Sequence, residues 1–432
     1  MSERNSELPG FYKLSVEERR KKVAEIAALN AAEMEVLGPH TGAEIAQLNR
    51  MIENVVGAFS LPLGIASNFR VNGKDYLVPM AIEEPSVVAA ASHAAKIARA
   101  GGGFHGGISG TRMIGQVQLL GVKDPHGAAL RILEEQKRLL ELANSKDPIL
   151  TKLGGGALAL ETRVLDSPRG AMLVVHVVVD VKDAMGANAV NTMSEALAPE
   201  LARLSGGRRH LRILSNLAIY RLARSRAVFP SSALAFGTWK GDDVVEGILD
   251  AWAMAAADPF RCATHNKGIM NGVSAVAIAT GNDFRALESG AHSYAAWKAP
   301  RGGVIAPLST YEKDANGDLV GTIEMPMAVG VVGGATASHP VAKLALKILG
   351  ITGAEELATV MAAVGLAQNF AALRALSTEG IQKGHMALHA RNVAIAAGAT
   401  GAEIDQVAEE MARTGTVRVD VAKEVLSRIR SG

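Results

Sequence analysis

The chain has 432 residues, of which 48% are hydrophobic and 20% charged, with 45 Lys and Arg against 43 Asp and Glu. This composition excludes a disordered chain, and at about 150 residues per domain the length predicts about three units. The balanced charge and the 4% aromatic content argue against a nucleic-acid-binding surface.

The cysteine and hydropathy patterns indicate the compartment. Cys262 stands alone, so no disulfide can form within the chain, as is typical of a reducing cytoplasm. The first residues lack the apolar core of a signal peptide. The apolar stretch 170–181 is shorter than the roughly 20 residues of a membrane helix. We therefore expect a cytoplasmic protein with neither a membrane nor a nucleic acid as partner.

The first 110 residues predict two helices and a hairpin. Ser15 and Glu18 form a capping box at the start of the first helix. A strand pair over 63–80 turns at Asn72-Gly73. A second helix starts at Pro85 and ends at the glycines from Gly101.

Residues 111–219 have a different rhythm. The residues with odd numbers from Leu173 to Val181 are apolar, the period of two of a strand with one buried face. The order of elements is βαββαβ, which is the ferredoxin-like pattern. The strands are predicted at 113–122, 157–166, 170–181 and 210–217, and the helices at 126–145 and 188–204.

Helices dominate after residue 220. They are predicted at 243–257, 283–297, 340–349, 354–374 and 385–397, with a hairpin of strands 306–312 and 319–325 and an amphipathic, charged segment from 398. The predicted fold class is α+β: a large, mainly helical domain, an inserted ferredoxin-like small domain and a C-terminal helical flap. The predicted boundaries are 1–110 and 220–375 for the large domain, 111–219 for the small domain and 376–432 for the flap.

Three motifs match part of a known dinucleotide, calcium or zinc motif, but each lacks another part that the motif requires. Gly101, Gly103 and Gly106 match G-x-G-x-x-G, but they follow a helix, whereas the dinucleotide fingerprint follows a strand. The turn Asp314–Asp318 begins like a calcium loop, yet glycine and glutamate are missing at its sixth and twelfth positions. His385 and His389 lie one helical turn apart without the glutamate of a zinc helix. We therefore predict no metal site.

Four polar clusters lie in apolar surroundings, and each has a structural and a functional reading. Glu84, ahead of Pro85, is either a helix cap or a buried general acid. Lys267 lies among amides and glycines, in either a solvated loop or an oxyanion clamp. Asp283 follows the predicted strand 276–279 and is either a cap or a site residue. His385, after Gly384, starts a surface helix or belongs to a moving lid.

A fifth cluster, Asp183–Asn188, joins a buried strand to a helix of the small domain. Gly186 allows close approach of a ligand, and a helix N-terminus favours phosphate. A plain strand-to-helix turn explains the same residues, so the cluster alone is a weak cofactor signal.

Taken together, the motifs resemble one family. The sequence is similar to the bacterial, soluble class (class II) of 3-hydroxy-3-methylglutaryl-CoA (HMG-CoA) reductases, over nearly the whole chain. The resemblance rests on ordered segments: Glu53-Asn54-Val55-Val56-Gly57, Glu84-Pro85-Ser86, Asp183-Ala184-Met185-Gly186-Ala187-Asn188, Gly281-Asn282-Asp283 and Gly384-His385-Met386.

The resemblance implies a four-electron interconversion of HMG-CoA and mevalonate, with two nicotinamide cofactors and free CoA. It implies that Lys267 stabilises the oxyanion, Glu84 donates a proton to mevaldehyde, and His385 protonates the CoA thiolate. Asp283 would lie between Glu84 and Lys267. Positions that hold the HMG group are matched by Ser86, Arg261 and Asn271.

The resemblance also implies a cofactor site on the small domain, matched by Asp183, Met185, Gly186 and Asn188, with Asn216 as a further candidate. Asp147 falls where some NAD-preferring relatives carry an aspartate near the adenosine ribose, and a carboxylate there would repel a 2′-phosphate. We therefore predict NAD(H) over NADP(H), which would favour mevalonate breakdown. Lys146 beside it favours the opposite, and Asp147-Pro148 is also a plain helix start.

The resemblance further implies a homodimer with active sites at the subunit interface, and a possible hexamer, as is common among bacterial members of the family. The segment 53–57 matches the dimer-interface motif. Two other functions remain open: a CoA-dependent lyase or acyltransferase without redox chemistry, and a non-catalytic scaffold. The lyase has no use for a small cofactor domain, and the scaffold has no use for the four catalytic side chains.

Overall fold

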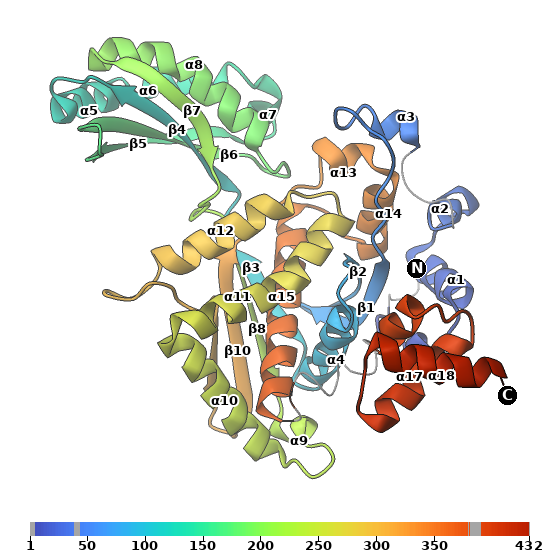
Figure 1. Cartoon of the computed structure of the whole chain (residues 1–432). Coiled ribbons are helices and arrows are strands. Elements are labelled where there is room, and N and C mark those ends of the chain that lie inside the picture. Colours follow the sequence, from blue (N-terminus) through green and yellow to red (C-terminus); the bar gives the residue numbers. More distant parts are fainter. Residues whose placement is uncertain (1–4, 39–43, 379, 381–389, 432) are drawn as a thin grey trace.

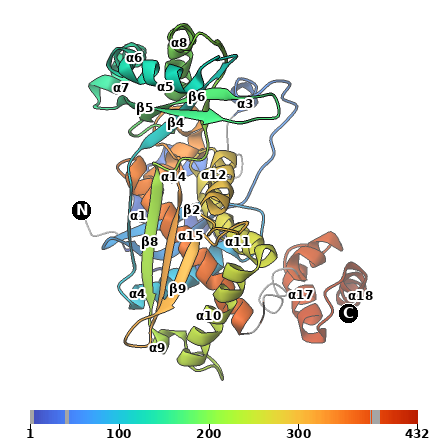
Figure 2. The same cartoon turned by 90° about the vertical axis from the view of Figure 1, so that its left-hand side faces the viewer.

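The computed structural model describes residues 5–38, 44–378, 380 and 390–431 (Figure 1). It confirms the predicted α+β fold class, with one six-stranded sheet, one four-stranded sheet and a helical C-terminal part. The small sheet with its helices lies at one end of the larger body in both views (Figures 1 and 2).

The large body is built on a sheet with the strand order β2-β1-β3-β8-β10-β9. Its hairpins β1–β2 and β9–β10 were predicted, whereas β3 and β8 were not. The strands are β1 (Leu63–Val71), β2 (Lys74–Ala81), β3 (Phe104–Ile108), β8 (Leu222–Phe229), β9 (Ser309–Lys313) and β10 (Leu319–Pro326).

The glycines of the rejected dinucleotide motif serve this sheet. A Cβ at Gly106 would lie 2.2 Å from the Arg224 carbonyl oxygen of β8, and one at Gly103 would lie 2.6 Å from the Arg70 oxygen. No side chain fits at these distances, so the glycines allow β3 to insert between β1 and β8.

Helix α15 is the centre of the large core. One continuous run, from Leu357 to Phe370, is buried on all sides. The helix is long and apolar enough to cross a membrane, but 83% of its most apolar window is buried inside the protein. It packs against α4, α10, α11 and the sheet, and the ring of Phe370 stacks on Phe229 of β8.

The helices of the large body, from the N-terminus, are α1 (Val16–Ala27), α2 (Ala31–Val36), α3 (Ile45–Leu48), α4 (Val87–Ala100), α9 (Ser231–Leu234), α10 (Gly241–Ala257), α11 (Pro259–Ala279), α12 (Phe284–Trp297), α13 (Gly334–Ser338), α14 (Pro340–Leu349) and α15 (Ala354–Ser377). The predicted capping box of Ser15 and Glu18 is present at α1.

The small sheet has the strand order β5-β6-β4-β7, all antiparallel, which is the ferredoxin-like arrangement. Its inward residues, among them Leu173, Val175 and Val177, are fully buried under the helices. The elements are β4 (Arg112–Leu120), α5 (Pro125–Glu134), α6 (Gln136–Asn144), α7 (Pro148–Lys152), β5 (Gly156–Leu165), β6 (Met172–Asp180), α8 (Ala187–Ser205) and β7 (Arg208–Ser215).

One predicted helix is divided. The helix expected over 126–145 is two helices, α5 and α6, which meet at Glu135. Buried Ala128 and Ile132 lie on the first, and buried Leu139 and Ala143 on the second. The break lets both short helices keep their apolar sides on the curved sheet.

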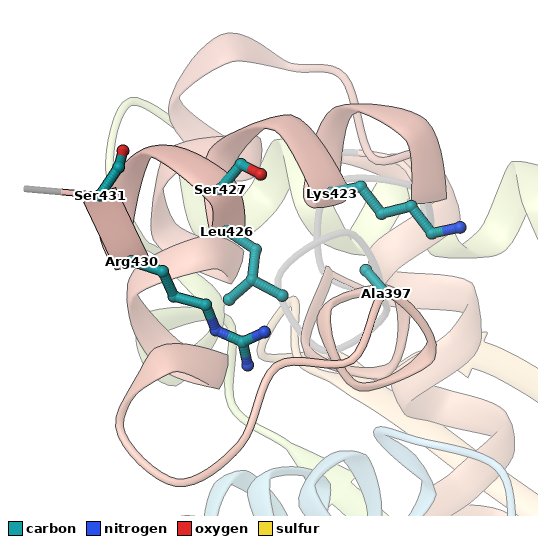
Figure 3. Close-up of a pocket in the computed structure, with 6 residues that line it drawn as sticks. All are labelled: Ala397, Lys423, Leu426, Ser427, Arg430 and Ser431. Carbon is teal, nitrogen blue, oxygen red and sulfur yellow. The ribbon is translucent and has the colours of Figure 1, made fainter.

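The C-terminal unit has its own core. Helices α17 (Glu403–Thr414) and α18 (Val419–Ser431) pack on each other and on residues from Ala390 to Ala399. A hollow of about 420 Å³ on this unit is lined by Ala397, Lys423, Leu426, Ser427, Arg430 and Ser431 (Figure 3). In Figure 2 the unit stands to one side of the main body.

Candidate active site

Helix α11 positions the predicted lysine. Asp258 caps it by accepting the Arg261 N–H, and Pro259 occupies its first position. Lys267 and Asn271 are one turn apart, so they lie on the same side of the helix. The opposite side of α11 is buried against α15 and α10.

The loop considered for residues 264–268 and the strand predicted for 276–279 are both absent. Both segments belong to α11, and 276–279 is its last turn. Buried residues recur every three or four positions, at Cys262, His265, Ile269 and Val273. This helical period extends through the short apolar run, which by itself does not distinguish a helix from a strand.

A buried polar network braces α11 from behind. The His265 Nε2 lies 2.7 Å from the Ser309 Oγ, and Ser309 donates to the Asn369 Oδ1 at 2.8 Å. Tyr311 donates to the same oxygen at 3.0 Å. Burial lowers the pKa of His265 to about 3, so this imidazole is neutral at pH 7. The network joins α11, β9 and α15 at fixed polar contacts.

Glu84 meets the exposed side of α11. Its Oε2 accepts a hydrogen bond from the Lys267 Nζ at 3.2 Å and from the Asn271 Nδ2 at 3.3 Å. The Glu84 side chain is 34% exposed and that of Lys267 is 60% exposed. The structure therefore brings together a carboxylate, an ammonium and an amide that are 183 and 187 residues apart in the chain.

Ser86 follows this carboxylate in an uncommon conformation. Its φ is 74°, in the left-handed region, and its hydroxyl does not cap α4, although Ser86 is the residue before that helix. This backbone conformation costs free energy for a residue other than glycine, and residues that adopt it are common at functional sites. The hydroxyl is thus available to a ligand beside Glu84. Arg261 is half-buried in the first turn of α11.

Asp283 is held by the next helix. Its Oδ1 accepts the N–H groups of Arg285 and Ala286, and it pairs with the Arg285 guanidinium at 3.1 Å. These bonds are those of the helix cap. Its place between Glu84 and Lys267 stays a prediction, and the predicted acid His385 lies outside the described residues, as does His389.

The predicted cofactor loop joins β6 to α8. Gly186 has φ 102°, and a Cβ on it would lie 2.6 Å from Val181. Asn188 is exposed in the first turn of the 19-residue helix α8, whose N–H groups point toward the loop. Gly186 therefore lets the loop pack closely on Val181, and the feature that suits the phosphates of a dinucleotide is the N-terminus of the long helix.

Asp183 does more than form a turn. Its Oδ1 accepts the N–H of Ala354 at the start of α15, and its main-chain oxygen accepts the N–H of Val331. It also lines a hollow of about 640 Å³ together with residues of β1, β2, β3 and α15. Asp183 therefore ties the loop to the large body.

Asp147 directly precedes α7, and Asn216 directly follows β7. Asp147 caps α7 by accepting the Leu150 N–H at 2.9 Å, with Pro148 at the first position, as in a plain helix start. The glycines after α7 run beside the cofactor loop, since a Cβ at Gly154 would lie 3.9 Å from the Lys182 Cε. Asn216 is exposed directly after β7.

Arg221 was not predicted. It is 2% exposed, and its guanidinium donates to the main-chain oxygens of Ala184, Met185 and Val329. The sequence offered one signal, a single charged residue between the apolar residues of 217–223.

A sequence model of the hydroxymethylglutaryl-coenzyme A reductase family matches residues 15–390. The 3-hydroxy-3-methylglutaryl-coenzyme A reductase of Archaeoglobus fulgidus is 61% identical over 99% of this chain and 95% of its own length. A probable reductase of the same name from Borreliella burgdorferi is 35% identical over 89% of this chain and 87% of its own.

Solved structures of reductases have a similar fold. A reductase from Streptococcus pneumoniae superposes with a TM-score of 0.83 at 40% identity, over 98% of this chain and 99% of the other. A class II reductase from the same organism, bound to NADPH in open conformations, gives 0.82 at 42% identity, over 86% and 99%. The predicted resemblance is confirmed, and the chain belongs to the HMG-CoA reductase family.

Proposed function

We propose that Glu84, Lys267 and Asn271 form the centre at which this HMG-CoA reductase changes the thioester. The observation that carries the proposal is that the Lys267 ammonium and the Asn271 amide converge on one oxygen of Glu84. Hydride addition to a carbonyl produces an oxyanion, and a nearby fixed positive charge stabilises it. Lys267 is that charge, and it is held in place by a helix with a buried opposite side.

Glu84 acts as the proton donor to the second carbonyl, that of mevaldehyde. Its hydrogen bonds to Lys267 and Asn271 orient the carboxyl group toward the same space. Ser86 and Arg261 hold the HMG group, through an uncommitted hydroxyl and a guanidinium suited to a carboxylate. Asp283 tunes the pair, and His385 protonates the departing CoA thiolate.

A nicotinamide cofactor supplies the hydride when it is bound. The residues present fit such a group, because α8 offers N–H groups at its start and Asn188 is exposed beside them. We assign Asp183, Met185, Gly186, Asn188 and Asn216 to its binding.

The test of the catalytic centre is Glu84→Gln, with the neighbour Glu83→Gln as control, because Glu83 is exposed. We expect kcat to fall about 10²-fold to 10⁴-fold for Glu84→Gln, with little change in KM for HMG-CoA. Equal activity of the two variants would contradict the assignment.

We further propose a preference for NAD(H), and with it mevalonate oxidation as the working direction. Asp147 lies at the start of α7, and the loop that follows α7 runs beside Lys182 of the cofactor loop. A carboxylate near the ribose accepts bonds from its 2′-OH and repels a 2′-phosphate. A relative with NADPH bound and the neighbouring Lys146 favour the alternative, an NADP(H)-dependent biosynthetic reductase.

The test is Asp147→Ala. We expect the ratio of kcat/KM for NADH to that for NADPH to fall about tenfold or more. Asp124→Ala is the matched control, since Asp124 also precedes a proline and caps its helix, by accepting the Gly127 N–H. The same fall in both variants would trace the effect to a lost cap, and no fall in either would contradict the role of Asp147.

We infer that the chain assembles as a homodimer with shared active sites. Apolar side chains stand exposed along one segment: Met51 at 40%, Ile52 at 65%, Val56 at 104% and Phe59 at 92%. This segment includes the 53–57 motif, and such surface suits a buried interface. Light scattering of the wild type and of Val56→Asp tests this inference. We expect the wild type to be a dimer or hexamer and Val56→Asp to dissociate it. A monomeric wild type would contradict the inference.

A further inference from the structure

Arg221 is a buried cation bonded to main-chain oxygens. It lies directly before β8, and its Nη1 donates to Ala184 at 3.0 Å and to Met185 at 3.1 Å. Its Nη2 donates to Val329 at 2.5 Å. Burial lowers its pKa to about 10, so it remains charged at pH 7. Placing a guanidinium in the interior is costly, and its three bonds to carbonyls offset that cost.

All of these bonds join one loop to one segment. Ala184 and Met185 belong to the loop between β6 and α8, whereas Val329 belongs to the large body after β10. The same two pieces touch again, because Ala184 pairs with Val332 in a parallel bridge. A Cβ on Gly330 would lie 2.5 Å from the Met185 nitrogen, so the two main chains are in direct contact.

The large-body segment is itself anchored. The Gly330 N–H donates to the Asn282 Oδ1 at 2.8 Å, and Asn282 belongs to the turn between α11 and α12. The Val329 side chain is fully buried in the large core. The loop is thus fastened to a rigid base, and not only to its own small domain.

We propose that Arg221 is a positioning residue for the cofactor: it holds residues 184–185 on the large body and so fixes the orientation of the loop that binds the dinucleotide. The inference rests on the proposed assignment of residues 183–188 to the cofactor. A guanidinium reaches three carbonyls at once because its donors form a planar fork, whereas an ammonium is a point charge. Arg221→Lys therefore keeps the charge and loses the geometry.

The experiment uses the full-length enzyme with Arg221→Lys and Arg221→Met. We expect the Kd and KM for NADH to rise about tenfold in the lysine variant and more in the methionine variant, since small misplacements in a site have large effects. We expect KM for HMG-CoA to change less than about twofold. Hydrogen exchange should accelerate at residues 184–187. Arg226→Met is the control, because Arg226 is an exposed arginine of β8, the strand that follows Arg221.

A comparison variant separates this inference from the site assignment. If Asn188→Ala weakens NADH binding while Arg221→Lys does not, the cofactor site stands and the positioning role is overturned. If neither variant changes NADH binding, the loop assignment fails and the role of Arg221 fails with it. Equal rises in KM for NADH and HMG-CoA would show a general structural role and also overturn the inference. Should Arg221→Met not fold, the lysine variant decides.

Discussion

Helix α11, which carries Lys267, and the C-terminal unit, which follows the predicted acid His385 in the chain, are held in place by opposite means. Helix α11 is continuous with the large core, and a buried network of His265, Ser309, Asn369 and Tyr311 braces its rear side. The C-terminal unit packs around a separate core that includes Val407 and Met411. Helix α11 is stabilised by the core of the large body, whereas the C-terminal unit is stabilised by its own separate core.

The difference corresponds to two tasks. In the proposed mechanism Lys267 meets a developing negative charge at a fixed place, and preorganised groups do this without moving during the reaction. A unit with its own core can shift as a rigid body, since few buried contacts break when it moves. We therefore expect α11 to stay fixed and the C-terminal unit to move during turnover.

The largest expected effect comes from the fixed element. Lys267→Ala should lower kcat about 10²-fold to 10³-fold, because it removes the charge that stabilises the oxyanion. The melting temperature should change little, because the Lys267 side chain is 60% exposed. Steady-state kinetics and a thermal melt measure both. Lys343→Ala, on the exposed side of α14, should leave both unchanged. Unchanged turnover in Lys267→Ala would sink the proposed mechanism.

The second effect tests the separate core. A chain that ends after Ser377, near the predicted boundary at 376, should keep a melting temperature within about 4 °C of wild type, because the large core is left complete. It should bind NADH as before. Turnover should fall about 10²-fold or more, because the segment carrying the predicted acid His385 is absent.

Two results of the truncation would contradict the comparison. Loss of folding would show that the C-terminal unit supports the large core. Full turnover would show that the segment holds no catalytic group.

The smallest effect concerns the brace behind α11. The pKa of His265 is about 3 in the folded protein because of burial, against about 6.5 when unfolded. Between these values the unfolded chain binds the additional proton, so this contribution to stability is complete above pH 6.5 and is lost as the pH falls toward 3. From pH 7 to pH 5 the loss is about 2 kcal/mol.

His265→Asn should flatten this dependence, because asparagine does not titrate. Urea unfolding at pH 7 and pH 5 in both proteins measures the difference. His126→Asn is the control, as His126 is not in the core. Equal pH dependence in wild type and His265→Asn would contradict the neutral, buried state of His265.

The sequence predicted the small domain more accurately than the large one. In β6 every second residue is apolar and fully buried, and this alternation can be read from the sequence without the tertiary structure. Strand β8 carried a similar alternation, with Arg224 and Arg226 exposed between buried neighbours, but its short alanine and serine side chains hid the period. Strand β3 has no such pattern, and its Gly106 is explained only by the close approach of Arg224 in β8.

The site residues likewise divide into those with a local sequence signal and those without one. Glu84 and Lys267 stood out as charged residues in apolar surroundings, and the structure brings them to 3.2 Å. Residue order alone could not show that His265 faces away from Lys267, because the segment was not recognised as a helix. Arg221 escaped because its partners are main-chain oxygens of two distant segments, and no side-chain motif records them.

The most direct measurement follows the absorbance of reduced nicotinamide with purified protein, mevalonate and CoA, comparing NAD+ with NADP+. The account predicts CoA-dependent reduction of NAD+. Reduction of NADP+ alone would keep the reductase and overturn the role of Asp147. No reduction of either, with HMG-CoA and both reduced cofactors also inert, would contradict the catalytic assignment of Glu84 and Lys267.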